Sequence, residues 1–279
     1  MKKISRRSFL AAAGLSVAAL ALTACGGSSA STASSVASSA ASSEAASTSA
    51  AAGELTTVEA GKLTMATNAA FPPYEMTTDA GEFEGIDIET AQAIADKLGL
   101  ELQIDDMDFD AALLSVQQGK ADIVMAGVTV TDERKAVMDF SDSYATGIQS
   151  IIVPEGSDIA SPDDLAGKKI GTQRGTTGYI YCSDDFGDDA VVAYDDGLTA
   201  VQALNNGQVD AVVIDNAPAQ EFIAANPGLK ILDTSYAEED YAIGMAKGSS
   251  LEDDVNAALE ELKDDATLQS IVDKYITAE

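Results

Sequence analysis

Short apolar segments alternate with amphipathic segments between residues 63 and 225, and this alternation constrains the fold more than any other feature. Strands are predicted at residues 63–67, 100–104, 121–125, 169–172, 191–194 and 210–214. Helices are predicted between and after them, at residues 86–98, 109–117, 198–205 and 217–225. Strands that alternate with helices indicate an α/β fold, in which parallel sheets carry helices on both faces.

Two segments of the chain share one pattern. Residues 112–125 and 200–214 each contain a helix, a glycine at its end, an aspartate and a buried strand. Five residues after the aspartate, the first copy has Gly127 and the second has Asp215. The match is short, so either a true repeat or ordinary βαβ construction explains it. A true repeat would give two α/β lobes with a ligand cleft between them, because open α/β sheets bind ligands beyond the carboxyl ends of their strands.

Residues 1–24 are predicted to be an export signal. A basic head precedes an apolar run at residues 8–24 that is too short and too rich in alanine for a membrane span. Residues 5–10 resemble the twin-arginine export signal, although an ordinary secretory signal can also carry two arginines. Residues 22–25 resemble a bacterial lipobox, in which Cys25 receives a lipid such as palmitate; the alternative is an unmodified cysteine.

The stretch that follows Cys25 is predicted to be a flexible tether. Residues 26–53 are almost entirely Ser, Ala, Gly and Thr, and Glu44 is their only charge. Such a segment buries too little apolar area to offset its conformational entropy. Together, lipidated Cys25 and the tether (residues 25–53) would hold a folded part, from residue 54 onward, at the outer face of the cell membrane.

Composition excludes several classes of function. The chain has 46 acidic and 16 basic residues and a net charge of −30, which disfavours nucleic acid and anionic lipid as partners. It has no histidine, which removes Ser-His-Asp catalysis and most zinc sites, so no metal or cofactor is expected. Cys25 and Cys182 are the two cysteines; a lipidated Cys25 leaves no disulfide, and Cys182 is predicted to be a packed free thiol.

Two loops have the character of ligand sites. In AGVTVTDER (residues 126–134), Gly127 allows close approach of the backbone, and Arg134 offers a fork of donors matched to a carboxylate. An ordinary ion pair of Arg134 with a neighbouring acid is the alternative. Residues 169–178 read as a strand, a turn rich in Gly and Thr and a helix start, which together can seat an anion. They lack the Gly-Lys-Ser/Thr ending of a P-loop, so no nucleotide site is predicted.

Six motifs in order resemble a known family: TNAAFPPYE (67–75), GIDIE (85–89), MDF (107–109), ADIVMAGVTVTDERKAVMDFSDSY (121–144), GTQRGTT (171–177) and DAVVIDNAP (210–218). From about residue 62 to residue 275 the chain resembles the bacterial extracellular solute-binding proteins of family 3, which bind polar amino acids for ABC importers. The resemblance implies a two-lobed periplasmic-binding-protein fold of type II, a flytrap with two hinge crossings near residues 145–149 and 235–241. Lobe 1 would comprise residues 54–147 and 239–279, including two final helices near 251–262 and 268–276. Lobe 2 would comprise residues 148–238.

The resemblance also implies which residues bind the ligand's backbone groups. Arg134 would bind the α-carboxylate, helped by Thr129 and by the N–H and hydroxyl of Thr177. Asp215 would bind the α-ammonium, together with the Gly127 carbonyl and the Thr129 hydroxyl. This division agrees with the need of a zwitterion leaving water to have each charge paired.

The ligand side chain would be flanked by aromatic residues, which are Phe71, Phe109 and, nearby, Tyr74; the two phenylalanines could instead be core residues. Asn68 and Gln173 are expected where the side chain ends. Two neutral amides favour a polar, uncharged or small side chain over a cationic one. Glu75 or Arg174 would overturn this expectation if either turned inward.

In function, the resemblance implies the extracytoplasmic substrate-binding component of an ABC amino-acid importer, and not an enzyme. A monomer would close around a free amino acid and deliver it to the transmembrane subunits of a permease. One alternative is a sensor that presents the ligand to a receptor. Another is an enzyme similar to cyclohexadienyl dehydratases, which use a carboxylic acid in the cleft; Asp215 and the complete central motif argue against it.

Overall fold

The structure of the protein, a computed structural model, describes residues 55–276. The predicted export signal, Cys25 and the tether lie outside the described residues. Within residues 55–276, no helix is both long enough and apolar enough to cross a membrane.

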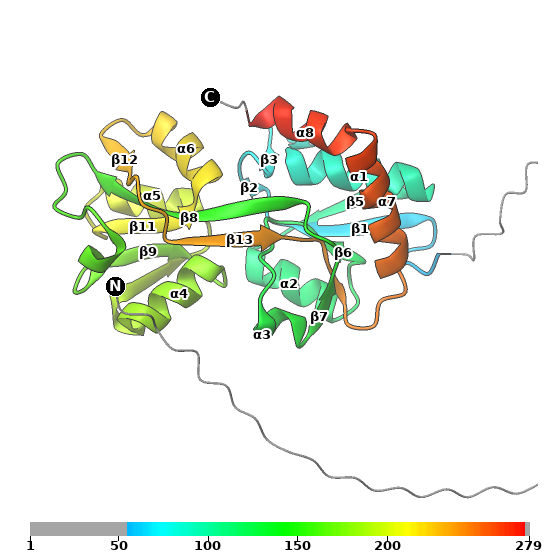
Figure 1. Cartoon of the computed structure of the whole chain (residues 1–279), viewed down its shortest axis with the longest axis horizontal. Coiled ribbons are helices and arrows are strands. Elements are labelled where there is room, and N and C mark those ends of the chain that lie inside the picture. Colours follow the sequence, from blue (N-terminus) through cyan, green and yellow to red (C-terminus); the bar gives the residue numbers. More distant parts are fainter. Residues whose placement is uncertain (1–54, 277–279) are drawn as a thin grey trace, which may run out of the picture. The chain divides into compact units, whose positions relative to one another are not determined.

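The first large sheet contains five strands and forms the core of one lobe (Figure 1). In spatial order they are β5 (Glu101–Asp106), β1 (Lys62–Thr67), β6 (Ile123–Val124), β14 (Gly244–Ala246) and β7 (Met138–Phe140). β1 runs parallel to β5 and β6, whereas β14 runs antiparallel to β6 and β7. One face packs on α1 (Ile86–Leu98), against which α7 (Glu252–Asp264) and α8 (Thr267–Tyr275) pack in turn, and the other face packs on α2 (Phe109–Gln117).

Alternation along β1 explains why both faces of this sheet are covered. Met65 packs in the core that α1 and α7 complete, and the next residue, Ala66, packs in the core that α2 completes. Successive side chains of a strand point to opposite faces, so a strand that is apolar throughout requires cover on both. Helix α1 ends at Gly99, whose φ of 69° is the left-handed conformation that terminates a helix.

The second large sheet has six strands and forms the core of the other lobe. In spatial order they are β10 (Val191–Tyr194), β9 (Ile170–Gln173), β11 (Ala211–Asp215), β8 (Ala145–Pro154) and β12 (Leu229–Ile231), and β13 (Ala237–Tyr241) also pairs with β8. α4 (Thr177–Phe186) covers one face, while α5 (Gly197–Asn205) and α6 (Asn216–Ala225) cover the other. Cys182 is buried on α4 and makes no disulfide, as predicted.

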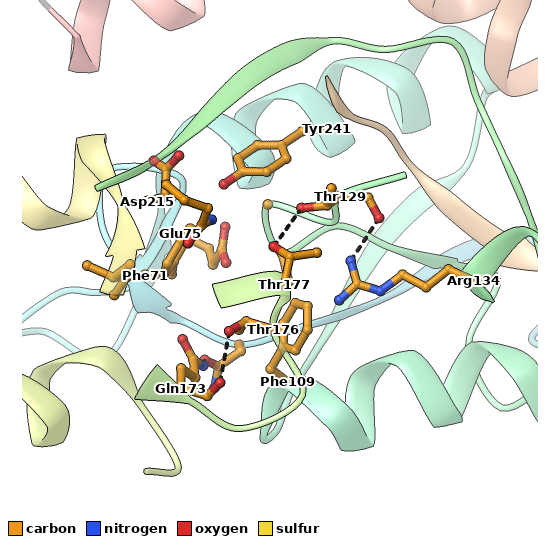
Figure 2. A pocket seen from close by; sticks show the side chains of 15 residues that line it. Phe71, Glu75, Phe109, Thr129, Arg134, Gln173, Thr176, Thr177, Asp215 and Tyr241 are labelled. Carbon is orange, nitrogen blue, oxygen red and sulfur yellow. Dashed lines mark hydrogen bonds between the residues drawn. The ribbon is translucent and has the colours of Figure 1, made fainter. Parts of the chain in front are cut away.

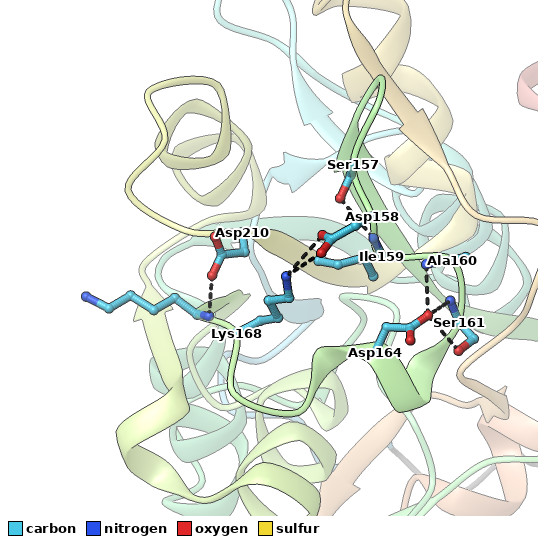
Figure 3. A network of polar contacts seen from close by, with 9 residues as sticks. Ser157, Asp158, Ile159, Ala160, Ser161, Asp164, Lys168 and Asp210 are labelled. Carbon is cyan, nitrogen blue, oxygen red and sulfur yellow. Dashed lines mark hydrogen bonds and ion pairs between the residues drawn. The ribbon is translucent and has the colours of Figure 1, made fainter.

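Short elements complete the described chain. They are a small sheet of β2 (Ala70–Phe71), β3 (Glu75–Thr77) and β4 (Phe83–Glu84), the short helix α3 (Asp132–Lys135), and the 3-10 helices η1 (Pro162–Leu165) and η2 (Asp188–Ala190). The loop before β9 is fixed by side chains (Figure 3). There Asp164 accepts hydrogen bonds from the N–H groups of Ala160 and Ser161, and Lys168 pairs with Asp158 at 3.0 Å.

Two strands carry the chain between the sheets. β8 follows β7 of the first sheet and enters the second sheet, and β13 leaves the second sheet and leads to β14 of the first. They lie side by side as an antiparallel pair, from Ala145 opposite Tyr241 to Gln149 opposite Ala237 (Figure 1). Both predicted crossings fall within this pair. The residue boundaries of the two lobes stay a prediction.

The predicted parallel pairing is confirmed for β1 with β5 and β6 and for β9 with β10 and β11. The sheets are nevertheless mixed, because β7, β8, β12, β13 and β14 pair antiparallel with their neighbours. A strand that arrives from the other lobe enters its sheet without a preceding crossover helix, so it need not run parallel. β8 was missed in the sequence because it lies outside the regular strand–helix alternation.

The pattern shared by residues 112–125 and 200–214 is a structural repeat. Each copy has a glycine with positive φ at the helix end, Gly119 at 65° and Gly207 at 67°. In the first copy, the Asp122 carboxylate accepts a hydrogen bond from the N–H of Thr64 in the neighbouring strand β1, at 2.8 Å. In the second, Asp210 accepts from the N–H of Lys169, directly before the neighbouring strand β9, at 2.7 Å (Figure 3). Each aspartate therefore joins two parallel strands at the same place in its lobe.

Candidate functional site

A cavity lies where residues from both sheets meet. The empty space in the cavity and at its mouth is about 390 Å³, part of which is open to solvent. Nine of the ten residues predicted for ligand binding line it, and these are Asn68, Phe71, Phe109, Gly127, Thr129, Arg134, Gln173, Thr177 and Asp215. The lining also includes Glu75, Ala126, Gln149, Thr176, Ile214 and Tyr241, which were not predicted (Figure 2).

Arg134 is a buried cation at one end of the cavity. Its side chain is 8% exposed; Nη1 donates to the carbonyl of Thr129 at 2.8 Å and Nη2 donates to that of Gly175 at 3.1 Å. The guanidinium also lies 5.4 Å from the centre of the Phe109 ring. Burial lowers the pKa of Arg134, and the negative charge of Glu239 opposes that effect. Among the described residues Arg134 makes no ion pair, so the alternative of a local pair with a neighbouring acid does not hold.

Asp215 is a buried carboxylate on the other side of the cavity (Figure 2). It ends β11, is 2% exposed, and accepts hydrogen bonds from the N–H groups of Ile148 at 2.7 Å and Ala217 at 3.0 Å. Burial raises its pKa to about 6, against the lowering effect of those N–H groups. No lysine or arginine of residues 55–276 pairs with it. The cavity therefore presents a positive charge and a negative charge, and neither makes an ion pair within residues 55–276.

Gly127 shapes the wall between these charges. Its φ is 54°, and a Cβ there would lie 3.0 Å from the Phe71 ring and 3.3 Å from the Tyr241 ring. Its N–H donates to the buried carboxylate of Asp87 at 3.0 Å. Asp87 also accepts from the hydroxyl of Tyr144 at 2.8 Å. The glycine is thus required both by its backbone conformation and by the close approach of two aromatic rings.

Contacts between the two lobes close over the cavity. The Gln173 amide donates to the Asn68 side-chain oxygen at 2.8 Å. The hydroxyl oxygens of Thr129 and Thr177 lie 3.4 Å apart, and Arg134 reaches the Gly175 carbonyl as described above. Thr177 begins α4, whose N-cap is the neighbouring Thr176. The arrangement is a closed cleft, with each predicted ligand-binding loop facing the other.

Tyr74 does not line this cavity. It lies behind Phe71, with ring centres 5.9 Å apart, and packs edge-on against Tyr241 at 5.4 Å. Phe71 and Glu75 are paired residues of the antiparallel strands β2 and β3, so both side chains face the same way. Tyr74 lies in the turn between the two strands, and its side chain packs against the rings of Phe71 and Tyr241 outside the cavity lining.

Among the residues missing from the predicted site, Glu75 has the largest effect on which ligand the cavity favours. Glu75 is 0% exposed, and no N–H or O–H group of the described residues donates to either carboxylate oxygen, although the Asp87 carboxylate lies close enough to share a proton with it. Burial raises its pKa well above the ordinary value, and the charge of nearby Asp87 adds to the effect. Arg174 is instead exposed and lies 3.4 Å from Asp195, away from the cavity. Of the two residues able to overturn the expected ligand class, Glu75 turns inward.

Three of the remaining unpredicted residues, Ala126, Thr176 and Ile214, directly precede predicted ones, and the other two share an origin. Gln149 lies on β8 and Tyr241 on β13, the two crossing strands, and the sequence has no local signal for which of their residues face a cleft. No group of three or more Cys, Asp or Glu side chains in the described part of the chain is arranged to hold a metal ion.

Comparison with known proteins agrees with this architecture. A probable histidine-binding protein of Neisseria gonorrhoeae is 32% identical over 276 residues, which cover 96% of this chain and 95% of that protein. The L-cystine-binding protein TcyJ of Escherichia coli (strain K12) is 32% identical over 226 residues, 79% of this chain and 85% of that protein. A solved structure of an ancestral arginine-binding protein bound to glutamine superimposes with a TM-score of 0.75 at 41% identity, covering 78% of this chain and 99% of that one.

These relatives are binding proteins, which confirms the prediction that the chain is not an enzyme. The likeness to the solved structure confirms the two-lobed α/β fold of type II. Residues 63–278 match the family described as bacterial extracellular solute-binding proteins, family 3. The chain belongs to this family of extracellular solute-binding proteins.

Proposed function

We propose that this protein binds one free L-α-amino acid between its lobes and delivers it to the transmembrane subunits of an ABC importer. The observation that carries the proposal is the pair of buried charges, Arg134 and Asp215, in one cavity, neither of which makes an ion pair with a described residue. A buried ion without a partner is costly, so each favours a ligand that supplies the opposite charge. A zwitterionic amino acid supplies both, with its α-carboxylate at Arg134 and its α-ammonium at Asp215.

We further propose that the ligand carries a positively charged side chain, such as that of L-arginine. The uncharged side chain expected from Asn68 and Gln173 has weaker support, because these two amides hydrogen-bond to each other. Buried Glu75, beside the cavity, accepts no hydrogen bond from an N–H or O–H group of the described residues, and a guanidinium matches a carboxylate with two parallel hydrogen bonds. The ligand's cation would compensate a third buried charge.

A neutral amide ligand, such as L-glutamine, is the second candidate. The raised pKa of Glu75 favours its protonated form in the empty cavity. If Glu75 kept that proton on binding, it would act as a neutral donor and acceptor, which suits an amide. The ancestral arginine-binding protein described above is bound to glutamine in its solved structure. A cleft of this kind therefore accepts both a cationic side chain and a neutral amide.

A thermal-shift panel of the common amino acids, with cystine, ornithine and citrulline, tests the proposal. A ligand at 1,000 times its Kd stabilises the folded protein by about 4 kcal/mol. Arg134→Ala should abolish the shift for every amino acid, whereas Arg174→Ala, at an exposed arginine outside the cavity, is the matched control and should leave it intact. Absence of any shift in the wild type would remove the basis of the proposal.

Calorimetry at pH 7 in two buffers of different ionisation enthalpy separates the two ligand classes. A cationic side chain lowers the pKa of Glu75 and should release its proton to the extent that Glu75 is protonated in the empty protein, whereas a neutral amide leaves the protonation of Glu75 unchanged. Glu75→Gln should remove the proton release. Tighter binding of L-glutamine than of L-arginine, without proton release, would establish the second candidate instead.

We also propose that Cys25 carries the lipid and anchors the protein, as a monomer, outside the cell membrane. The lipobox-like sequence at residues 22–25 supports this. A Cys25→Ser variant should move from the membrane fraction to the soluble fraction and lose the lipid mass. Retention in the membrane fraction would contradict the anchor.

A further inference from the structure

A carboxylate that the predicted site did not include lies directly behind the cavity. Glu239, on the crossing strand β13, is 6% exposed and is not among the residues that line the cavity. Its Oε2 accepts hydrogen bonds from the hydroxyls of Thr177 at 2.9 Å and Thr129 at 3.0 Å, and from the Gln149 amide at 3.0 Å. One oxygen thus joins a residue of each lobe to both crossing strands.

The contact with Glu239 fixes the direction of the hydroxyl hydrogens of Thr129 and Thr177. A carboxylate can only accept, and a threonine hydroxyl has one hydrogen and two lone pairs. When Glu239 accepts from Thr129 and Thr177, both hydroxyl hydrogens point away from the cavity. Their oxygens, 3.4 Å apart and both lining the cavity, then have only lone pairs left for a ligand.

The donors that remain at this end of the cavity are N–H groups. Arg134 has further guanidinium hydrogens beyond the two that it gives to carbonyl oxygens. Thr177 is the first residue of α4, and the first N–H groups of a helix have no partner within it. A carboxylate can be held by these groups without either hydroxyl.

We infer that Glu239 is a positioning residue that makes the hydroxyls of Thr129 and Thr177 acceptors for the ligand's α-ammonium. The inference rests on the proposed binding of an amino acid, and it changes one expected role. The resemblance assigned the Thr177 hydroxyl to the α-carboxylate, whereas here the hydroxyl has no hydrogen to give. Selection for an amine over a hydroxyl at the α-carbon then depends on a residue that does not touch the ligand.

Glu239→Leu tests this, because a leucine side chain accepts no hydrogen bond. The hydroxyl hydrogens of Thr129 and Thr177 are then free to turn toward the cavity and face the α-ammonium. The ligands are L-arginine and L-argininic acid, which has a hydroxyl in place of the α-ammonium. If the wild type binds L-glutamine instead, that amino acid and its 2-hydroxy analogue are used. Glu238→Leu, at the adjacent exposed residue of the same strand, is the matched control.

Calorimetry should show the amino acid bound at least about tenfold more weakly by Glu239→Leu, since a lost hydrogen bond to a charged group is worth that much. The hydroxy analogue should change by less than about threefold, because a hydroxyl either donates or accepts. Equal weakening of both ligands, or unchanged binding of the amino acid, would overturn the inference. If the wild type binds no amino acid, the proposed function fails as well; if it binds one and Glu239→Leu behaves like Glu238→Leu, the inference alone fails.

Thr177 offers a second test, whose single variants do not depend on the folding of the Glu239 variant. Thr177→Ser keeps the hydroxyl and should preserve the preference for the amino acid over the hydroxy analogue. Thr177→Val should lose affinity for the amino acid but little for the hydroxy analogue. Combined with Glu239→Leu, Thr177→Val should cost less than the sum of the two single effects, because both act through one hydroxyl. Additive losses would contradict the shared mechanism.

Discussion

Asp215 is expected to make the empty protein less stable as the pH rises. Its pKa is about 6 in the folded protein against an ordinary value of 3.8. A carboxyl whose pKa is raised by folding holds its proton more tightly in the folded state, so the free energy of unfolding falls between those two pH values and stays low above them. From these values, ionisation of Asp215 lowers the free energy of unfolding by about 1.6 kcal/mol at pH 5 and about 3 kcal/mol at pH 8.

Asp215→Asn removes this dependence. The asparagine keeps one acceptor oxygen, so the variant loses one of the hydrogen bonds from Ile148 and Ala217, at a cost of about 1–3 kcal/mol that is independent of pH. The difference in free energy of unfolding, variant minus wild type, should therefore rise by about 1.4 kcal/mol between pH 5 and pH 8. The same variant should bind amino acids poorly at every pH.

Urea unfolding of the empty protein, followed by circular dichroism at pH 5, 6, 7 and 8, measures this difference. Asp233→Asn, at an exposed aspartate, is the control and should give a difference that does not change with pH. A constant difference for Asp215→Asn would refute the reasoning, because it would mean that Asp215 ionises in the folded protein as easily as in the unfolded chain.

Three further substitutions have expected outcomes. Arg134→Lys should weaken amino-acid binding by at least about tenfold in calorimetry, because one ammonium cannot replace a guanidinium that holds two carbonyls and a carboxylate; wild-type affinity would contradict this. Gly127→Ala should lower the free energy of unfolding by about 1–2 kcal/mol for its positive φ, and more through the contact with Phe71, as measured by urea unfolding. Asp122→Ala, which strips two backbone N–H groups of a charged acceptor, should cost about 2–4 kcal/mol in the same assay. Asp122→Ala should lower the free energy of unfolding by more than Asp210→Ala, which removes the acceptor of a single N–H group, that of Lys169. Equal losses for the two variants would contradict the hydrogen-bond assignment.

The charged ends of the site were predictable because local sequence positions them. Asp215 ends a buried strand and caps the following helix, and Arg134 follows a buried strand by one short loop and a helix start. Such signals span few residues, so the sequence carries them directly. The helices and the parallel strands were found for the same reason.

What escaped prediction depends on contacts between distant segments. Tyr241 and Gln149 line the cavity, and Glu239 lies directly behind it, because β13 pairs with β8 across about ninety residues of chain. Glu75 turns inward, and Tyr74 does not, because Glu75 is paired with Phe71 in a hairpin whose register the sequence leaves open. The expected ligand class rested on Asn68 and Gln173, and their mutual hydrogen bond was equally invisible in the sequence.

The central claim is that Arg134 and Asp215 hold the two charged ends of one amino acid. Calorimetry at pH 8 with three ligands tests it most directly: L-arginine, agmatine, which lacks the α-carboxylate, and Nα-acetyl-L-arginine, which lacks the α-ammonium. Each loss leaves one buried charge uncompensated, so both analogues should bind at least about a hundredfold more weakly than L-arginine. Binding of either analogue with the affinity of L-arginine would contradict the claim.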